Sequence, residues 1–169
     1  IVKKLNGALR FYSEPGKGSE FRLYLPVELE ADLDEVGQVE APAQGGSETI
    51  LLVDDEEQII AMEEQILKRL GYRVISHTNG MDALEVFARQ PSTFDLVITD
   101  LSMPKMPGDQ LASELRQIQP DIPIILCTGF SEKMTPEKAE EIGINEVLLK
   151  PIVMKELAWK IRSILDSYT

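Results

Sequence analysis

The sequence contains one cysteine, one histidine and no long apolar run. A single cysteine cannot form an internal disulfide, and because Cys127 lies within an apolar segment we expect a core thiol rather than a nucleophile. No segment approaches the roughly 18 apolar residues that cross a bilayer, and the first residues lack the basic and apolar pattern of a signal peptide. We therefore expect a cytoplasmic chain without direct membrane contact. Because it begins with Ile1 rather than Met, we also expect it to be part of a longer protein.

Basic residues are also scarce. The 17 Lys and Arg residues are outnumbered by 29 Asp and Glu residues, which gives a formal net charge of -12. Such a surface repels nucleic acids and anionic lipids, so neither is expected as a partner. The hydrophobic fraction of 43% and the aromatic fraction of 6% are ordinary for a soluble globular protein. A length of 169 residues favours one domain with an appendage.

Composition divides the chain into three regions. Residues 1–26 contain two segments of alternating apolar and polar residues joined by the turn from Glu14 to Ser19, which predicts a β-hairpin. Residues 27–47 hold six acidic residues and no periodic apolar face, which indicates a flexible acidic linker. In residues 48–169, strand-like runs alternate five times with helical patterns. This predicts a (βα)5 α/β fold, a doubly wound parallel sheet with the flavodoxin-like strand order 2-1-3-4-5.

The expected helices have clear limits. Apolar residues before Gly71, Met62 among them, fall on one helical stripe, and a glycine often supplies the left-handed residue after a helix. Thr135 predicts an N-cap, and Gly143 predicts the end of a short, polar helix. The last helix has a continuous apolar stripe, and Trp159, between its core positions, is expected to be half-buried.

Polar residues follow four of the five expected strands. They are Asp54 and Asp55 after the first, Asp100 after the third, Thr128 after the fourth and Lys150 after the fifth. Ligands of parallel α/β sheets bind at the carboxyl ends of the strands, so these side chains should converge. The carboxylates would repel one another without a cation, and their oxygens favour Mg²⁺. With the metal in place, one carboxylate can act as the nucleophile on a phosphoryl group, while Lys150 and Thr128 bind its oxygens.

Residues 48–169 share this pattern with a known family. The acidic pair follows the first strand, and Asp100 is followed by the segment Leu101 to Pro104 and by Gly108. Thr128 follows the fourth strand, and Lys150-Pro151 follows the fifth. With all five key positions present, the segment resembles the receiver domain of two-component response regulators.

The resemblance implies a function for each residue of the site. Asp100 would accept a phosphoryl group from phosphohistidine, supplied by a histidine kinase or a histidine phosphotransfer domain. Asp55, Asp100 and the Ser102 carbonyl would bind Mg²⁺, with Asp54 acting through water. The Lys150–Pro151 peptide would be cis, which only an X-Pro bond adopts at modest cost. Such a domain switches conformation on phosphorylation and has at most autophosphatase activity.

Residues 1–26 carry a second, shorter resemblance, to the last strands of a histidine-kinase ATP-binding domain. The matching features are Asn6-Gly7, the turn from Ser13 to Ser19, and Leu25-Pro26. The Asn-rich and Gly-rich nucleotide boxes of such a domain do not occur in the sequence. Together, the two resemblances imply the C-terminal end of a hybrid histidine kinase, with the ATP site itself absent from this chain.

Each motif also has a simpler interpretation. Any one of the three acids could be an ordinary helix N-cap, but their occurrence together with Thr128 and Lys150 favours a site. Gly16 to Ser19 lacks the full spacing of a phosphate-binding loop and lies between strand-like segments, so a hairpin turn is the better interpretation. His77 ends a strand and precedes a turn, which favours strand closure over a phosphohistidine.

Two other functions compete with phosphoacceptance. An aspartate-nucleophile, Mg-dependent phosphatase also forms an aspartyl phosphate, but its nucleophile and acid lie on the first strand in an Asp-x-Asp pattern. Here Asp54 and Asp55 are adjacent, and the candidate nucleophile follows the third strand. A receiver used only for docking would be expected to have lost one of the five key residues, and none is lost.

Two positions depart from the family pattern. Many receivers carry Tyr or Phe three residues before the lysine, where this chain has Val147, and Phe130 stands where polar residues are common. We therefore predict that phosphorylation moves the short helix after Thr135, with a smaller change than in receivers with the aromatic residue. We also predict a long-lived aspartyl phosphate, because Ser102 is too short to orient an attacking water and Phe130 can shield the phosphorus.

Overall fold

The structure, a computed structural model, describes residues 2, 7–26, 45–129 and 134–168. They belong to two compact units, residues 1–39 and 40–169, which we describe separately. The division between the units falls within the segment 27–47 that we predicted to be a linker. Most of that segment, residues 27–44, lies outside the described residues, so its flexibility stays a prediction.

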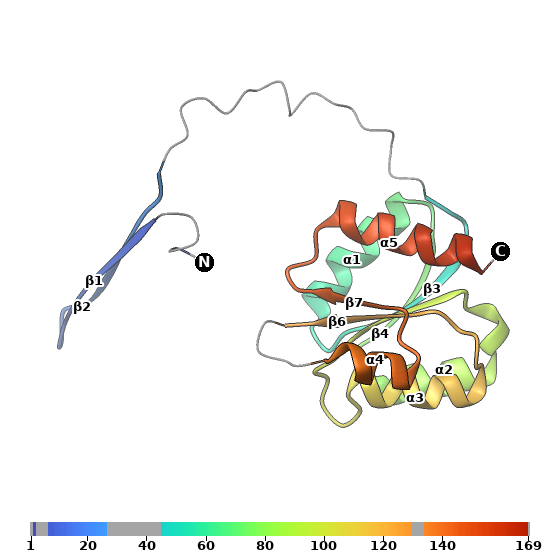
Figure 1. The fold of residues 1–169 in the computed structure, drawn as a ribbon. Coiled ribbons are helices and arrows are strands. Elements are labelled where there is room, and N and C mark those ends of the chain that lie inside the picture. The colour runs from blue at the N-terminus through green and yellow to red at the C-terminus, as the bar shows by residue number, and fades with distance from the viewer. Residues whose placement is uncertain (1, 3–6, 27–44, 130–133, 169) are drawn as a thin grey trace, which may run out of the picture. The chain divides into compact units, whose positions relative to one another are not determined.

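The first unit contains the predicted β-hairpin (Figure 1). Strand β1 (Ala8–Glu14) pairs antiparallel with β2 (Gly18–Tyr24), and Gly16 in the turn has a φ of 78°, which a glycine adopts without strain. Facing pairs of the register place four exposed apolar side chains on one face: Leu9 with Leu23, and Phe11 with Phe21. The hairpin is therefore amphipathic, and its apolar face is exposed.

The second unit is built on a five-stranded parallel sheet. Its strands are β3 (Thr49–Val53), β4 (Arg73–His77), β5 (Leu96–Asp100), β6 (Ile124–Thr128) and β7 (Glu146–Leu149). They lie in the order β4-β3-β5-β6-β7, and all four pairings are parallel. Counted within this unit, that is the predicted order 2-1-3-4-5. The three central strands are buried along their whole length, which explains their largely apolar sequences.

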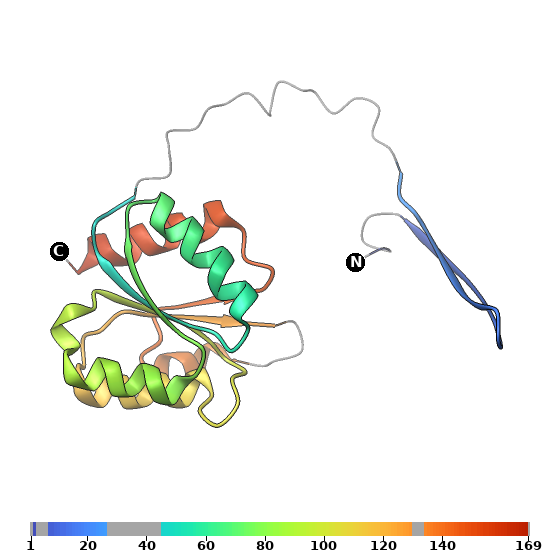
Figure 2. The ribbon, with the colours of Figure 1, turned by 180° about the vertical axis from the view of Figure 1, so that it is seen from behind.

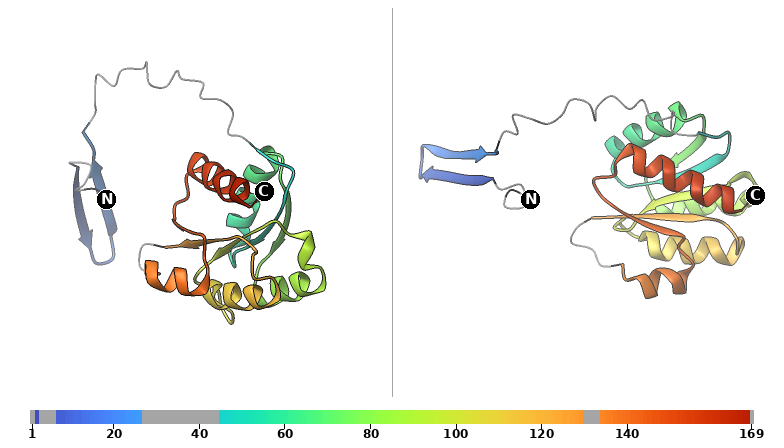
Figure 3. Two further views of the ribbon diagram at one scale, coloured as in Figure 1. Left: turned by 45° about the vertical axis from the view of Figure 1, so that its right-hand side comes forward. Right: turned by 45° about the horizontal axis from the view of Figure 1, so that its top comes forward.

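Helices cover both faces of the sheet. They are α1 (Glu57–Arg69), α2 (Gly80–Arg89), α3 (Gly108–Ile118), α4 (Pro136–Ile142) and α5 (Met154–Ser167), with a 3₁₀ turn η3 (Pro91–Thr93) before β5. Helices α1 and α5 pack on one face, and α2, α3 and α4 on the other (Figures 1 and 2). The same three layers are visible in both views of Figure 3. None of the helices in the described residues has the length and apolar content needed to cross a bilayer.

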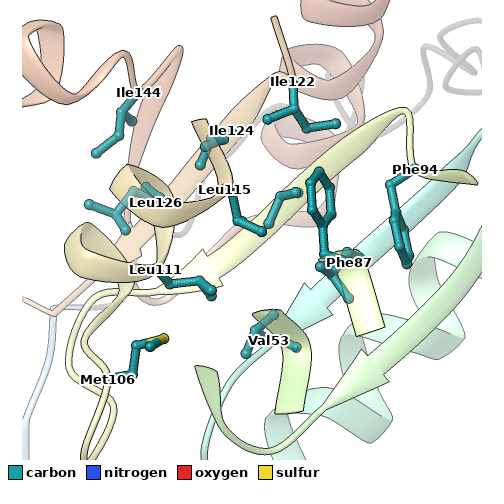
Figure 4. Packing of buried hydrophobic residues seen from close by; sticks show 14 of the residues in the cluster. Val53, Phe87, Phe94, Met106, Leu111, Leu115, Ile122, Ile124, Leu126 and Ile144 are labelled. Atoms are coloured by element: carbon teal, nitrogen blue, oxygen red, sulfur yellow. The ribbon is translucent and has the colours of Figure 1, made fainter. Parts of the chain in front are cut away.

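The sheet separates two hydrophobic clusters because successive side chains of a strand point to opposite faces. Leu51 and Val53 of β3 belong to the cluster beneath α2 and α3, whereas Ile50 and Leu52 belong to the cluster beneath α1 and α5. Figure 4 shows the first cluster, in which Leu111 and Leu115 of α3 lie beside Ile124 and Leu126 of β6, and Phe87 stacks on Phe94. Both faces of the sheet are thus fixed by packing.

The two ends of α4 lie where the sequence predicted them, whereas the exposure of two side chains on other helices differs from the sequence-based expectation. The Thr135 side chain accepts a hydrogen bond from the Lys138 amide, and Gly143 has a φ of 83°, as predicted for the two ends of α4. Trp159, predicted to be half-buried, is 63% exposed, so that prediction is wrong. Met62, which the sequence placed on the apolar stripe of its helix, is 49% exposed. In α1 the buried line is Ile60, Glu63 and Leu67. Apolar residues occur on more than one side of that helix, and the packing against the sheet selects among them.

Candidate functional site

The predicted polar residues lie at one edge of the sheet, where β3, β5, β6 and β7 end. Asp54 follows the last residue of β3, whose Val53 is in register with Thr99, and Asp100 is the last residue of β5. Thr128 ends β6 and is in register with Leu149, the residue before Lys150. The parallel register thus brings side chains from four strands to one edge, as the sequence predicted.

Lys150 joins the two acidic strand ends. Its Nζ lies 2.6 Å from Oδ2 of Asp54 and 2.5 Å from Oδ1 of Asp100. Both carboxylates are nearly inaccessible to solvent, with Asp54 3% and Asp100 7% exposed, whereas Lys150 is half-buried. Burial alone would lower the pKa of Lys150, but its hydrogen bonds to Asp100 and Asp54 outweigh burial and raise the pKa above its usual value. Lys150 is therefore a charged amine that offsets two buried carboxylates.

Backbone groups fix the remaining carboxylate oxygens. The amide of Ser102 donates to Oδ2 of Asp100 at 2.7 Å, and the amide of Glu56 donates to Oδ1 of Asp54 at 2.9 Å. Gly108 approaches the Asp100 backbone so closely that a Cβ at position 108 would lie 2.1 Å from the Asp100 carbonyl oxygen. The Gly108 amide donates to the Leu101 carbonyl at 3.0 Å. The loop after β5 is therefore held against Asp100, and only a glycine fits at position 108.

The remaining predicted residues border this centre. Thr128 is 2% exposed, and its hydroxyl donates to the Gly129 carbonyl at 3.3 Å. Asp55 and Ser102 are exposed. In the part of the chain that the structure describes, no three His, Cys, Asp or Glu side chains lie close enough together to form a metal-binding group. The arrangement thus brings Asp54, Asp100 and Lys150 into direct contact and leaves Asp55 open to solvent.

Other sequence predictions for this region have mixed outcomes. Cys127 is buried, and burial raises the pKa of its thiol, so it is an inert core residue as expected. The Lys150–Pro151 peptide is cis. Val147 is half-buried and packs against the hydrophobic cluster beneath α2 and α3. Phe130 lies outside the described residues, so the predicted shielding of the phosphorus stays a prediction.

Sequence reasoning missed Glu63, a buried carboxyl group on α1. It is 4% exposed and lies on the helix face that covers the sheet. Burial raises its pKa to about 7, with a further contribution from the negative charge of Asp54. Its position three residues after Ile60 and four before Leu67 would have indicated burial, but an acid is not expected at a core position.

Comparison with known proteins identifies the family. Residues 50–162 match the family model described as the response regulator receiver domain. The chain belongs to this family. It is also 32% identical to the protein named Sensor kinase CckA of Brucella abortus (strain 2308) over 174 residues, which cover 98% of this chain and 18% of that protein. Identity to the Sensor protein EvgS of Escherichia coli (strain K12) is 33%, over 93% of this chain and 13% of the relative.

Solved structures support the same assignment. A response regulator receiver domain protein from Clostridium thermocellum has a TM-score of 0.69 and 28% identity, covering 72% of this chain and 96% of that one. A signal receiver domain of an HD domain-containing protein from Pseudomonas fluorescens Pf-5 has a TM-score of 0.66 and 32% identity, covering 72% and 97%. The receiver fold is therefore shown by both sequence and structure.

Members of this family share a general biochemical role. Receiver domains accept phosphoryl groups from histidine kinases or phosphotransfer domains, and they generally use Mg²⁺ to do so. The receiver domain of this chain is accordingly consistent with a phosphoacceptor role in a phosphorelay. The chain spans only 18% and 13% of the two sensor proteins that it resembles over most of its length.

Proposed function

We propose that Asp100 is the phosphoacceptor of a hybrid histidine-kinase phosphorelay. The observation that carries this proposal is the ion pairing of one lysine, Lys150, with both Asp54 and Asp100 at the carboxyl edge of the sheet. Asp100 is the acid of this pair that ends the third strand of the unit. The donor would be phosphohistidine on a histidine kinase or a histidine phosphotransfer domain.

The oxygen donors at this edge are of the kind that Mg²⁺ prefers, although among the described residues no three of the acidic side chains are gathered into a metal-binding group. Mg²⁺ takes oxygen ligands, keeps several waters and needs few protein carboxylates. Asp54, Asp55, Asp100 and the Ser102 carbonyl would hold it, with Asp54 acting through water. Among the described residues, Lys150 is the one cation paired with Asp54 and Asp100, and one positive charge against two carboxylates leaves net negative charge that attracts a divalent cation. When bound, the metal would offset charge on the phosphoryl oxygens.

The residues of the chain would then carry out an in-line transfer. A carboxylate oxygen of Asp100 forms a bond to phosphorus while the phosphorus–nitrogen bond of phosphohistidine breaks, and the imidazole leaves with that electron pair. The Ser102 amide, which now donates to Oδ2 of Asp100, orients the carboxylate. Lys150 would bind an oxygen of the transferred group, and the Thr128 hydroxyl would donate to another.

Phosphotransfer from a phosphorylated histidine phosphotransfer domain tests this proposal. With Mg²⁺, the wild type should take up the phosphoryl group, Asp100→Asn should not, and EDTA should suppress the transfer. Asp121→Asn, which alters an exposed acid just before the amino end of β6, is the matched control and should behave like wild type. Equal transfer to Asp100→Asn would contradict the assignment.

We also propose that residues 1–26 are the end of a kinase ATP-binding domain. The matches to the two sensor proteins extend over 98% and 93% of this chain, and so beyond the receiver domain. A two-stranded unit is marginal alone in water, and the exposed apolar face of the hairpin needs a covering layer. The remainder of an ATP-binding domain would supply that layer. Calorimetry should show no ATP binding by this chain, and tight binding would contradict the proposal.

A further inference from the structure

The loop after β5 is anchored by two buried methionines. Between Asp100 and Gly108, Met103 is 3% exposed and Met106 is 9% exposed, and both belong to the hydrophobic cluster beneath α2 and α3. Ser102, whose amide donates to Oδ2 of Asp100, directly precedes the first of these anchors. The placement of Ser102 against Asp100 therefore depends on how deeply the two methionines sit in the cluster.

The loop is strained between its anchors. Among the described residues, Lys105 is the one residue other than glycine with a left-handed backbone, and its φ is 68°. Such a conformation costs free energy and persists only where the surrounding structure holds it. Here the Met106 amide donates to the Pro104 carbonyl at 2.8 Å, which closes a tight turn around Lys105. The position of Met106 thus sets the shape of this turn.

Gly80, the first residue of α2, is the wall against which Met106 packs. A Cβ at position 80 would lie 2.9 Å from the Met106 carbonyl oxygen and 3.0 Å from Cγ of Met106. Gly80 is buried and does not have a left-handed φ, so its backbone conformation is open to other residues. Glycine is also a poor helix former, so helix propensity does not explain its presence. The space that Met106 occupies does explain it.

The first turn of α2 is itself held in place. Only Thr78 and Asn79 connect this helix to β4, and Oδ1 of Asn79 accepts a hydrogen bond from the Asp82 amide at 2.9 Å. Farther along the helix, Ala83 and Phe87 are fully buried in the cluster. Because α2 cannot recede without opening the core, the loop after β5 must yield to a side chain added at the first position of the helix.

The two ends of that loop are also fixed. The Leu101 amide donates to the Cys127 carbonyl at 2.8 Å, and the Leu101 carbonyl accepts a hydrogen bond from the Gly108 amide at 3.0 Å. A displacement of Met106 must therefore be absorbed between these ends, where Ser102 lies. Ordinary contacts between heavy atoms are about 3.5 Å or longer. A Cβ that starts 2.9 Å from the Met106 oxygen thus requires a displacement of about 0.6 Å.

We propose that Gly80 is a positioning residue for phosphoryl transfer to Asp100. By leaving room for Met106, it sets the depth of the loop after β5 and so holds the Ser102 amide on the Asp100 carboxylate. It also places the Ser102 backbone whose carbonyl would bind Mg²⁺. A glycine with a merely structural role would affect the stability of the fold and leave the reaction of the folded protein unchanged. This inference rests on the proposed function of Asp100.

Labelling by acetyl phosphate tests the positioning. A misplacement of about 1 Å can slow a reaction about a hundredfold, so Gly80→Ala should slow labelling at saturating Mg²⁺ by about tenfold. It should also raise the Mg²⁺ concentration that gives half-maximal labelling. Met106→Ala removes the anchor without adding atoms, and it should slow labelling as well. Ile122→Val is the control, because it trims a fully buried residue of the same cluster before the amino end of β6. It should lower stability and leave the labelling rate unchanged.

A double variant shows whether the two residues act through one contact. If they do, Gly80→Ala combined with Met106→Ala should slow labelling by less than the product of the two single effects. Slowing by the full product would mean that Gly80 does not act through Met106, and would overturn the inference.

The amide proton shift of Ser102 in NMR spectra supplies a readout that needs neither metal nor phosphoryl donor. A hydrogen bond of 2.7 Å to a carboxylate moves this proton downfield, and Gly80→Ala should move it back toward the position of a free amide. Ile122→Val should leave it in place. If wild type is labelled, a Gly80→Ala protein that keeps the wild-type labelling rate or the wild-type Ser102 shift would overturn the positioning alone. Failure of the wild type to take up a phosphoryl group would overturn the proposed function of Asp100, and the positioning with it.

Discussion

Glu63 should make the stability of the receiver unit fall as the pH rises through neutrality. The residue is 4% exposed, and burial raises the pKa of its carboxyl group from the ordinary 4.5 to about 7. Between these two values the folded state binds more protons than the unfolded state. Stability therefore decreases with increasing pH across this window, and the decrease is complete once the pH exceeds the folded pKa.

The size of the effect follows from the shift. A shift of one pKa unit corresponds to about 1.4 kcal/mol, so the change from 4.5 to about 7 corresponds to about 3 kcal/mol of unfolding free energy. Glu63→Gln keeps the shape of the side chain and removes the charge. At pH 8 this variant should be more stable than wild type by up to about 3 kcal/mol, and at pH 4 the difference should disappear.

Urea unfolding followed by circular dichroism between pH 4 and pH 8 measures both proteins. Glu64→Gln is the matched control, because hydrogen bonds from Lys68 and Ser76 lower the pKa of the neighbouring Glu64. It should lower stability at neutral pH and leave the decline between pH 5 and pH 7 in place. If Glu63→Gln shows the same pH dependence as wild type, a charged Glu63 is tolerated at this buried position and the reasoning fails.

Three further predictions concern Lys105, the removal of residues 1–44, and Phe130. Lys105 has a φ of 68°, so Lys105→Gly should stabilise the domain by up to about 1 kcal/mol in denaturant unfolding, and a destabilisation would refute strain at this position. A chain beginning at Gly45 keeps the Gly46–Leu70 hydrogen bond and the Glu48–Arg162 ion pair, so its stability should match the full chain within about 1 kcal/mol. Phe130→Asn should speed phosphate release from the phosphoprotein about tenfold, corresponding to roughly 1.4 kcal/mol of barrier, and an unchanged rate would retire the shielding idea.

The sheet and its functional edge were predictable because strands that are buried on both faces have nearly continuous apolar sequences. The run 124–127 is apolar throughout and the run 96–99 departs from this only at Thr99, so the polar residue that follows each run marks the carboxyl end of a strand. Parallel pairing then places all such ends at one edge. The limits of α4 were predictable for a similar reason, since Thr135 and Gly143 act through local backbone geometry.

Features that depend on packing between elements were not predictable. Glu63 is buried because of how α1 lies on the sheet, and Trp159 is exposed because of how α5 lies there. The Asp109–Lys138 pair joins residues 29 positions apart, and nothing in their local sequence indicates the contact. Such features require the angle and depth at which each helix packs, which periodicity does not specify.

Mass spectrometry after incubation with acetyl phosphate and Mg²⁺ tests the central claim most directly. The wild type should gain one phosphoryl group, peptide mapping should place it on Asp100, and Asp100→Asn should gain none. Asp54→Asn, in which Lys150 keeps its partner Asp100, should retain the acceptor but label more slowly because the metal site is weakened. A phosphoryl group mapped to any other residue of the wild type, or undiminished labelling of Asp100→Asn, would contradict the account.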